Sequence, residues 1–160
     1  MRIFTAIPIP AKLRQFIIEK NVPISGTKWI VTENLHITLR FIGKVSEEDF
    51  LKIKEAFHKI PFSPFSVKIS DIGIFGSKKS PRIIWRGIKP EEKIIEMKKS
   101  IDEILYSLRI EKEKRSYRPH ITIGRIKQSG GKKKKDFLEK NIPFTQKNFL
   151  LIRFVCFQVL

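Results

Sequence analysis

Two short segments of the chain place a threonine two positions after a histidine. They read His36-Ile37-Thr38-Leu39 and His120-Ile121-Thr122-Ile123. Because alternate side chains of an extended strand share a face, each segment puts an imidazole and a hydroxyl on one face and aliphatic side chains on the other. The aliphatic face can join a core, which leaves the opposite face for chemistry.

Two imidazoles in one cleft suit a reaction in which one group takes a proton while another gives one, since histidine titrates near neutral pH. Phosphodiester hydrolysis is such a reaction. The hydroxyls of Thr38 and Thr122, together with a cation, would hold the non-bridging phosphate oxygens and offset their developing charge. Arg118 and Arg125 are the candidate cations.

Arg125 raises a geometric question because it follows His120 by five positions. Regular alternation would turn it to the face opposite the histidine. It reaches a shared phosphate only if the strand bends, and Gly124 is the expected place for that bend.

Other interpretations of the same residues stay open. A histidine on its own is often a hydrogen-bonded structural residue, and we expect this of His58. The threonines could be strand formers only. Histidines also bind zinc, but no carboxylate or thiol stands at ligand spacing beside either segment, so we predict no metal site and no cofactor.

Local patterns predict the elements that must position these residues. Alternating or continuous apolar runs predict strands at 2–7, 28–31, 35–42, 65–75, 82–88, 120–126 and 149–160, and helical spacing predicts helices at 11–20, 46–60 and 90–108. Ser46, followed by three carboxylates, is the expected N-cap of the second helix. No linker separates the halves, so residues 1–160 are predicted to form a single domain with two lobes.

Composition and charge limit the classes of protein. The chain has 160 residues, 41% of them hydrophobic, which is enough for one core and excludes a peptide hormone or a disordered tail. No apolar run is long enough for a membrane span or secretory signal, and the one cysteine, Cys156, cannot form an internal disulfide, so we expect a cytoplasmic protein. The net charge of +17 favours nucleic acid as the partner, although a basic, heat-adapted surface is an alternative explanation.

Longer stretches around both histidines resemble the two-histidine (2H) phosphoesterases, and within them the LigT-like RNA 2′,3′-cyclic phosphodiesterases, also called 2′-5′ RNA ligases. The stretches that carry the resemblance stand in family order within residues 1–127: Lys28–Val31, Glu33–Gly43, Gly73–Gly76, Pro81–Ile88 and Pro119–Arg125. The resemblance implies an α+β, bilobal fold with two pseudo-symmetric lobes, each with an antiparallel sheet and packed helices, around a basic groove.

The same resemblance implies metal-independent opening of a 2′,3′-cyclic phosphate to a 2′-phosphate. His120 would be the base that activates water and His36 the acid that protonates the departing 3′ oxygen, although these two roles could be exchanged. Thr38, Thr122 and Arg125 would bind the phosphate. The chain departs from the family near its end, because residues 148–160 stop early in an apolar run.

The remaining candidates concern RNA contacts. Phe4, Phe41, Phe75 and Trp85 are expected in the core, with Phe75 the candidate for stacking on a base. Lys132–Lys135, after two glycines, is either a solvated loop or a contact to the RNA backbone.

The sequence therefore predicts a monomeric enzyme that acts on RNA ends with 2′,3′-cyclic phosphates, tRNA fragments among them. Three alternatives remain. One is the reverse reaction, which joins RNA through a 2′-5′ linkage. Another is a noncatalytic module that binds RNA ends. The third is a phosphodiesterase of small cyclic nucleotides, whose activity would depend little on salt.

Overall fold

One antiparallel sheet organises the fold. The computed structural model describes residues 1–19, 21, 24–77, 80–127, 148–151 and 155–159. In chain order the elements are β1 (Arg2–Pro8), α1 (Ala11–Glu19), β2 (Thr27–Trp29), a short 3-10 turn (Thr32–Asn34), β3 (His36–Lys44), α2 (Glu47–His58), β4 (Phe65–Gly76), β5 (Pro81–Lys89), α3 (Glu92–Ser107), β6 (His120–Ile126), β7 (Asn148–Leu151) and β8 (Val155–Val159). The eight-stranded sheet has the order β7-β4-β5-β6-β3-β1-β8, with β2 paired to β6, so the predicted α+β class is confirmed.

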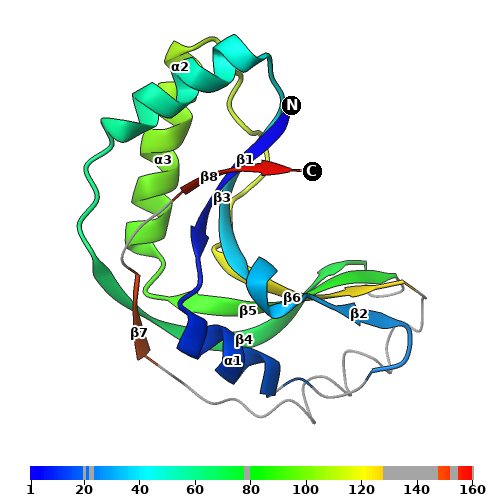
Figure 1. The fold of residues 1–160 in the computed structure, drawn as a ribbon. Coiled ribbons are helices and arrows are strands. Elements are labelled where there is room, and N and C mark those ends of the chain that lie inside the picture. The colour runs from blue at the N-terminus through cyan, green and yellow to red at the C-terminus, as the bar shows by residue number, and fades with distance from the viewer. Residues whose placement is uncertain (20, 22–23, 78–79, 128–147, 152–154, 160) are drawn as a thin grey trace.

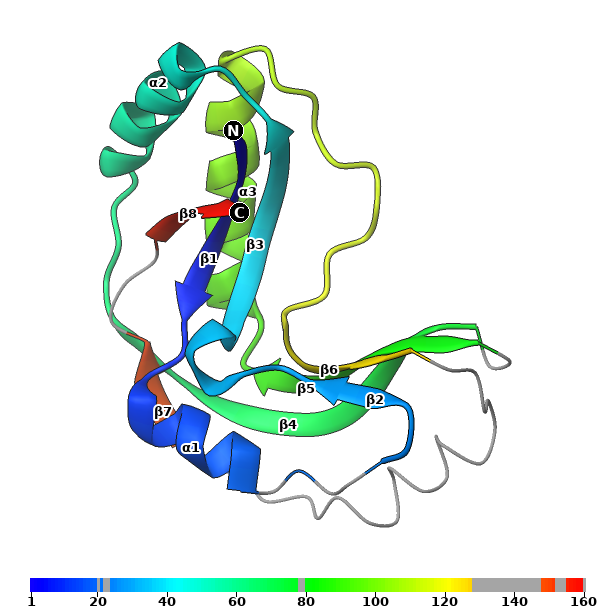
Figure 2. The same ribbon diagram turned by 45° about the vertical axis from the view of Figure 1, so that its right-hand side comes forward.

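The sheet changes direction where β3 meets β6. These two strands pair at one position only, Ile37 with Ile121. β1 and β3 run along the length of the molecule, whereas β4, β5 and β6 cross beneath them (Figure 2). The described strands thus form one continuous, strongly turned sheet where two separate sheets were expected, and the division into lobes stays a prediction.

Helices cover the two parts of the sheet separately. α2 and α3 lie beside β1 and β3, and α1 lies at the opposite end of the molecule, near β4 (Figure 1). The Ser46 hydroxyl accepts a hydrogen bond from the Asp49 amide, which confirms the predicted N-cap of α2. α3 begins at Glu92, two residues after the predicted start at Pro90. Of the helices within the described residues, none has the length and apolar character that crossing a bilayer requires.

The core runs through the joint between β3 and β6. Ile37 and Ile121 are fully buried, and they share one hydrophobic cluster with Leu13 of α1, Ile53 of α2 and Ile101 of α3. Each histidine segment therefore has its aliphatic face anchored in the core, as the alternation predicts.

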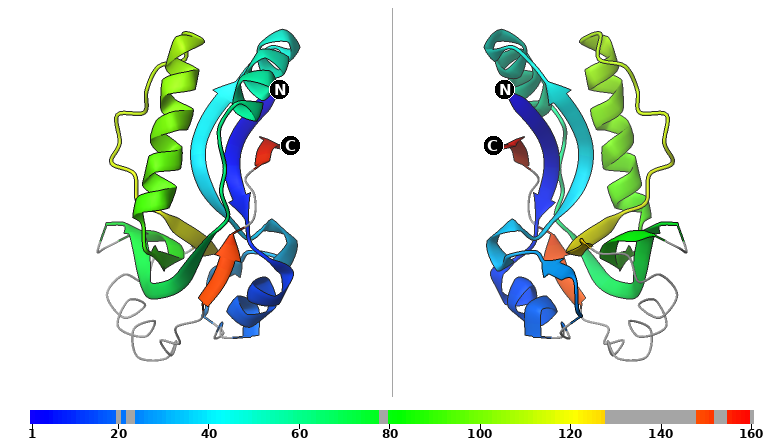
Figure 3. Two further views of the ribbon diagram at one scale, coloured as in Figure 1. Left: turned by 90° about the vertical axis from the view of Figure 1, so that its left-hand side faces the viewer. Right: turned by 90° about the vertical axis from the view of Figure 1, so that its right-hand side faces the viewer.

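The C-terminal apolar run differs from the prediction of one strand at 149–160. It forms two strands, β7 and β8, on opposite edges of the sheet. β7 pairs with β4, and β8 pairs with β1. The pairing of Arg2 with Val159 brings both ends of the described chain together, as the views in Figure 3 show.

Candidate active site

The two histidine segments meet at the joint of the sheet. The antiparallel pairing of Ile37 with Ile121 sets His36 across from Thr122 and Thr38 across from His120. All four side chains are half-buried, while the isoleucines between them are in the core. The fold thus brings together the four residues that the sequence proposed as partners.

Both imidazole rings are held in the same way. Nδ1 of His36 donates to the carbonyl oxygen of Asn34 at 2.6 Å, and Nδ1 of His120 donates to the carbonyl oxygen of Arg118 at 2.7 Å. A carbonyl oxygen only accepts, so the proton of each neutral ring lies on Nδ1. Nε2 is then the nitrogen that can take up or release a proton in each ring.

Burial governs the protonation of both rings. Desolvation is the largest cause that lowers the pKa of His36 and of His120 below the usual value of 6.5, and the carbonyl hydrogen bonds act in the opposite direction. The charge of His36 lowers the pKa of His120 further, and so does the charge of Arg118. The two rings therefore interact, and double protonation is disfavoured.

A β-bulge brings Arg125 back to the histidine face. On β6, Gly124 pairs with Ile84 and Thr122 pairs with Trp85, so Ile123 is the extra residue. Ile123 and Gly124 are both buried, and Arg125 is exposed. Its positive charge contributes to the lowered pKa of His36, as expected for a neighbouring cation. The bend that Arg125 requires is present, one residue before the expected glycine.

The same irregularity occurs on β3. Arg40 pairs with Thr5 and Thr38 pairs with Ala6, which leaves Leu39 as the extra residue. Each bulge thus follows the threonine of its segment. The short internal repeat seen in the sequence therefore extends to the position of a bulge in each strand.

Aromatic side chains surround His120. The Phe75 ring meets the His120 ring edge-on with centroids 4.7 Å apart, and it stacks on Trp85 at 5.1 Å. The Arg118 guanidinium lies 4.4 Å from the centre of the Trp85 ring. Gly73 is required beneath this group, since a Cβ there would lie 2.1 Å from the Trp85 ring. Phe75 and Arg118, both proposed as substrate-binding residues, therefore border His120.

A second aromatic pair lies beside His36. The Phe4 ring is 5.1 Å from the His36 ring and 5.8 Å from the Phe41 ring. Phe41 is 60% exposed, so the expectation of a core residue is wrong for it. The bulge at Leu39 is the physical reason, because it turns Phe41 outward, as the bulge at Ile123 turns Arg125 outward. Phe4 and Phe75 are only half-buried, and of the four aromatics expected in the core Trp85 alone is buried.

A buried polar cluster supports β3 from behind. Arg40 forms ion pairs with Asp102 of α3 at 3.4 Å and with Glu113 at 3.2 Å, and it also donates to the carbonyl oxygen of Glu111. Lys98 of α3 pairs with Asp102. The cluster ties β3 to α3 and to the segment that leads into His120.

Tyr117 joins the same segment directly to the threonine of β3. Its hydroxyl donates to the carbonyl oxygen of Thr38 at 2.9 Å. Burial raises the pKa of Tyr117, and Glu113 and Glu91 raise it further, so the hydroxyl keeps its proton and remains a donor.

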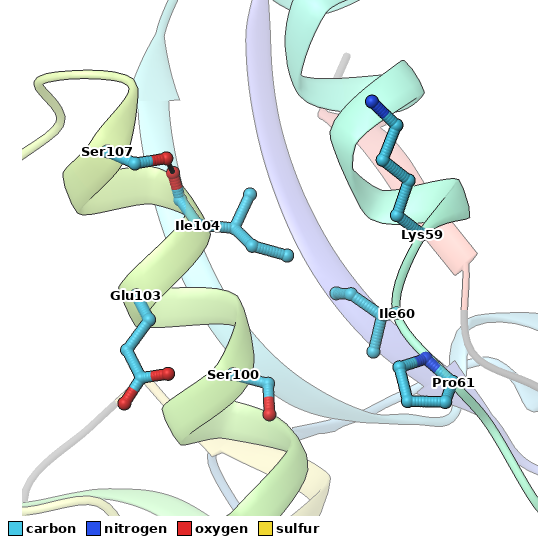
Figure 4. A pocket seen from close by; sticks show the side chains of 7 residues that line it. All are labelled: Lys59, Ile60, Pro61, Ser100, Glu103, Ile104 and Ser107. Carbon is cyan, nitrogen blue, oxygen red and sulfur yellow. Dashed lines mark hydrogen bonds between the residues drawn. The ribbon is translucent and has the colours of Figure 1, made fainter.

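Other predicted features lie elsewhere. Lys132–Lys135 falls outside the described residues. His58 ends α2 and is exposed. Within the described part of the chain, no three or more potential metal-ligand side chains of His, Cys, Asp and Glu gather at one place. A cavity of about 340 Å³ between the end of α2 and α3 contains none of the proposed site residues (Figure 4); it is lined by Lys59, Ile60, Pro61, Ser100, Glu103, Ile104 and Ser107.

Sequence reasoning missed several residues that shape the site. The carbonyl groups that hold the two imidazoles leave no sequence signal, because any residue supplies a carbonyl. Phe41 could have been found by extending the repeat, since it stands five positions after His36 as Arg125 stands five positions after His120. Tyr117 carries no pattern that separates it from a core aromatic.

Two half-buried imidazoles on paired antiparallel strands, with cations nearby, are groups that general acid–base chemistry on an anionic substrate would use. Comparison with known proteins agrees with this class. The chain matches the family described as "LigT like Phosphoesterase" over residues 7–85 and 87–158, and it belongs to that family. The predicted resemblance is thereby confirmed.

Individual relatives cover most of the chain. A protein of Methanocaldococcus jannaschii named "RNA 2′,3′-cyclic phosphodiesterase" is 40% identical over 144 residues, which span 88% of this chain and 80% of the relative. A protein of Archaeoglobus fulgidus with the same name is 34% identical over 131 residues, 80% of this chain and 74% of the relative. The crystal structure of E. coli LigT in its apo form superimposes with a TM-score of 0.76 at 25% identity, covering 97% of this chain and 85% of that one.

Proposed function

We propose that this protein is an RNA 2′,3′-cyclic phosphodiesterase, and that residues 1–160 act as one catalytic domain in the cytoplasm. The observation that carries the proposal is the pair of equivalently held imidazoles at the joint of β3 and β6. The names of the relatives in M. jannaschii and A. fulgidus support the substrate class. The net charge of +17 is consistent with a polyanionic substrate.

The reaction needs one neutral and one protonated imidazole. Nε2 of neutral His120 takes a proton from water as the water oxygen bonds to phosphorus. The bond between phosphorus and the 3′ oxygen breaks, and that oxygen receives the proton from Nε2 of protonated His36. The product carries a 2′-phosphate and a 3′-hydroxyl, and the two rings have exchanged protonation states.

The residues around the rings fit the charges of this reaction. The guanidinium of Arg125 and the hydroxyls of Thr38 and Thr122 would hold the non-bridging oxygens as negative charge develops. Arg118 and Phe75 border His120 and would contact the terminal nucleotide. The lowered pKa of the rings keeps the base neutral at neutral pH.

Product analysis tests the proposal. The substrate is a short RNA that ends in a 2′,3′-cyclic phosphate, with EDTA present, and the position of the product phosphate is read by NMR or by digestion with enzymes specific for each isomer. We expect a 2′-phosphate. A 3′-phosphate, or activity that disappears with EDTA and returns with zinc, would contradict the two-histidine route.

The same assay separates the alternatives. Binding of the RNA end without turnover would favour a noncatalytic end-binding module. Turnover of small cyclic nucleotides without RNA turnover, and without salt dependence, would favour a nucleotide phosphodiesterase. Joining of a second RNA through its 5′-hydroxyl in place of water would add the 2′-5′ ligase reaction.

A further inference from the structure

Arg125 has a cationic neighbour on the adjacent strand. The antiparallel register pairs Lys28 of β2 directly with Arg125 of β6. Side chains paired in this way have Cβ atoms about 5 Å apart, and like charges at such positions destabilise a sheet. Both side chains are exposed, and among the described residues neither has a carboxylate within ion-pair distance. The pair is therefore a local concentration of positive charge.

Packing shows which face of the sheet Lys28 occupies. On either side of it, Thr27 and Trp29 turn to the buried face, where they lie against Gly124; a Cβ on Gly124 would lie 3.0 Å from the Trp29 ring and 3.2 Å from the Thr27 methyl. Thr27 and Trp29 also line a cavity of about 710 Å³, and Lys28 is not part of its lining. Lys28 consequently shares the opposite face with Arg125, which is the face of the histidines.

Backbone hydrogen bonds fix β2 in this register. The amide of Ile30 donates to the carbonyl oxygen of Ile123 at 2.9 Å, and the amide of Lys127 donates to the carbonyl oxygen of Gly26 at 2.7 Å. β2 thus lies alongside the end of β6 (Figure 2). The position of Lys28 is therefore set by the backbone pairing of β2 with β6.

Four side chains form a row across the sheet on this face. The register aligns Phe75 of β4, Ile83 of β5, Arg125 of β6 and Lys28 of β2. Phe75 contacts the ring of His120, and the charge of Arg125 acts on His36. Neighbouring strands are about 4.8 Å apart, so Lys28 stands one strand away from Arg125, the cation whose charge acts on His36.

We propose that Lys28 binds the phosphate of the RNA linkage that precedes the terminal cyclic phosphate. This inference rests on the proposed function. Arg125 serves the reacting phosphate, and Lys28 serves the next one along the strand. Lys28 is then a residue that sets preference for an oligonucleotide, since a mononucleotide has no second phosphate to place there.

The test compares two substrates that differ in that phosphate. Wild type and Lys28→Gln are assayed on a 2′,3′-cyclic mononucleotide and on a trinucleotide ending in a 2′,3′-cyclic phosphate. We expect Lys28→Gln to raise KM for the trinucleotide about five- to tenfold with kcat unchanged, and to leave both constants for the mononucleotide unchanged. The logarithmic slope of trinucleotide affinity against salt should fall by about 0.7.

A matched control removes a charge elsewhere. Lys54 on α2 is exposed, and Lys54→Gln should leave KM for both substrates unchanged. Equal losses on both substrates would place Lys28 at the reacting phosphate and overturn the proposal. No loss on the trinucleotide would also overturn it.

Binding keeps this test separate from the proposed function. If wild type hydrolyses neither substrate, the proposed function fails, and the dissociation constants for the same two RNAs carrying a 2′-phosphate are measured by fluorescence anisotropy. Weaker binding of only the trinucleotide by Lys28→Gln supports the inference, and equal binding by both proteins overturns it.

Discussion

The rings of His36 and His120 are each held by a backbone carbonyl oxygen, which any residue supplies. The protonation of each ring therefore depends on the side chains around it. Each Nδ1 donates to a carbonyl oxygen two residues earlier in the chain. This arrangement assigns the same protonation site to both rings, and either ring could serve as acid or base. The neighbours that differ between the two rings are Arg125, whose charge acts on His36, and Arg118 with Trp85 beside His120.

The pH dependence of kcat/KM follows from the lowered pKa of both rings. The proposed mechanism needs one neutral ring and one protonated ring, so the rate should be highest between the two apparent pKa values of the pair. Because burial moves both values below 6.5, we expect a bell-shaped profile with its maximum below about pH 6.5. Initial rates on a cyclic-phosphate RNA, measured from about pH 4.5 to about pH 9 on both sides of the ordinary histidine pKa, give the profile. A maximum near pH 8 would contradict the assignment.

Arg125 should change that profile through its charge. In Arg125→Gln the positive charge that opposes protonation of His36 is lost, so the pKa of His36 rises and one limb of the profile moves to higher pH. We also expect kcat/KM to fall about 10- to 100-fold, since a charge-assisted contact to the phosphate is lost. Arg125→Lys keeps the charge and should keep the limb in place. An unmoved limb in Arg125→Gln would show that Arg125 does not face His36.

At the scale of elements, the joint between β3 and β6 needs support because the two strands share a single pair. The segment before His120 supplies it. Tyr117 holds the Thr38 carbonyl, and Arg40 holds the Glu111 carbonyl and the Glu113 carboxylate. These contacts connect the two histidine strands without adding a strand pair.

Tyr117→Phe tests this connection. The variant removes a buried hydrogen bond of 2.9 Å and keeps the ring, so the free energy of unfolding should fall by about 1–2 kcal/mol. We expect kcat to fall as well, with KM nearly unchanged, since the strand that carries His36 and Thr38 loses a fixed point. Urea unfolding and steady-state kinetics measure the two effects. Tyr106→Phe is the control, because Tyr106 is 63% exposed. Equal stability of both variants would show that the Tyr117 hydroxyl does not stabilise the connection to β3.

Most elements could be predicted because their signals are local. Apolar periodicity and the Ser46 cap predicted α2, and the strand at 120–126 was predicted with the bounds it has. The split of residues 149–160 into β7 and β8 could not be predicted, since both halves are apolar and their partner strands lie at opposite edges of the sheet. Choice of partner strand is a property of the whole fold.

The candidate site was predictable to a similar degree. The repeat indicated the two histidines and two threonines, because side-chain alternation is set by each strand alone. The bulges at Leu39 and Ile123 could not be predicted from the sequence, since both positions hold ordinary aliphatic residues. Those bulges decide where Phe41 and Arg125 point, and for that reason Phe41 was wrongly expected in the core.

At the scale of the whole molecule, the C-terminal run closes both edges of the sheet. β8 pairs with β1 and β7 pairs with β4, so neither β1 nor β4 is an edge strand. The net charge of +17 favours the approach of polyanions, such as the proposed RNA substrate, before specific contacts form.

Removal of residues 148–160 should expose β1 and β4 together. We expect the midpoint of thermal unfolding to fall by about 5 °C or more, and the truncated protein to self-associate through the exposed edges. Differential scanning fluorimetry and size-exclusion chromatography measure both effects. Removal of residues 155–160 alone uncovers only β1 and should have the smaller effect. An unchanged midpoint in the longer truncation would contradict the pairing of β7 and β8.

The central claim is that His36 and His120 act together on one phosphodiester. The most direct measurement is single-turnover hydrolysis of an RNA ending in a 2′,3′-cyclic phosphate by wild type, His36→Ala, His120→Ala, the double variant and His58→Ala, with RNA binding measured in parallel. We predict a loss of at least about 1000-fold in each single variant, a double variant no slower than the singles, and unchanged binding and wild-type rates in His58→Ala. Either single variant turning over RNA at the wild-type rate would contradict the account.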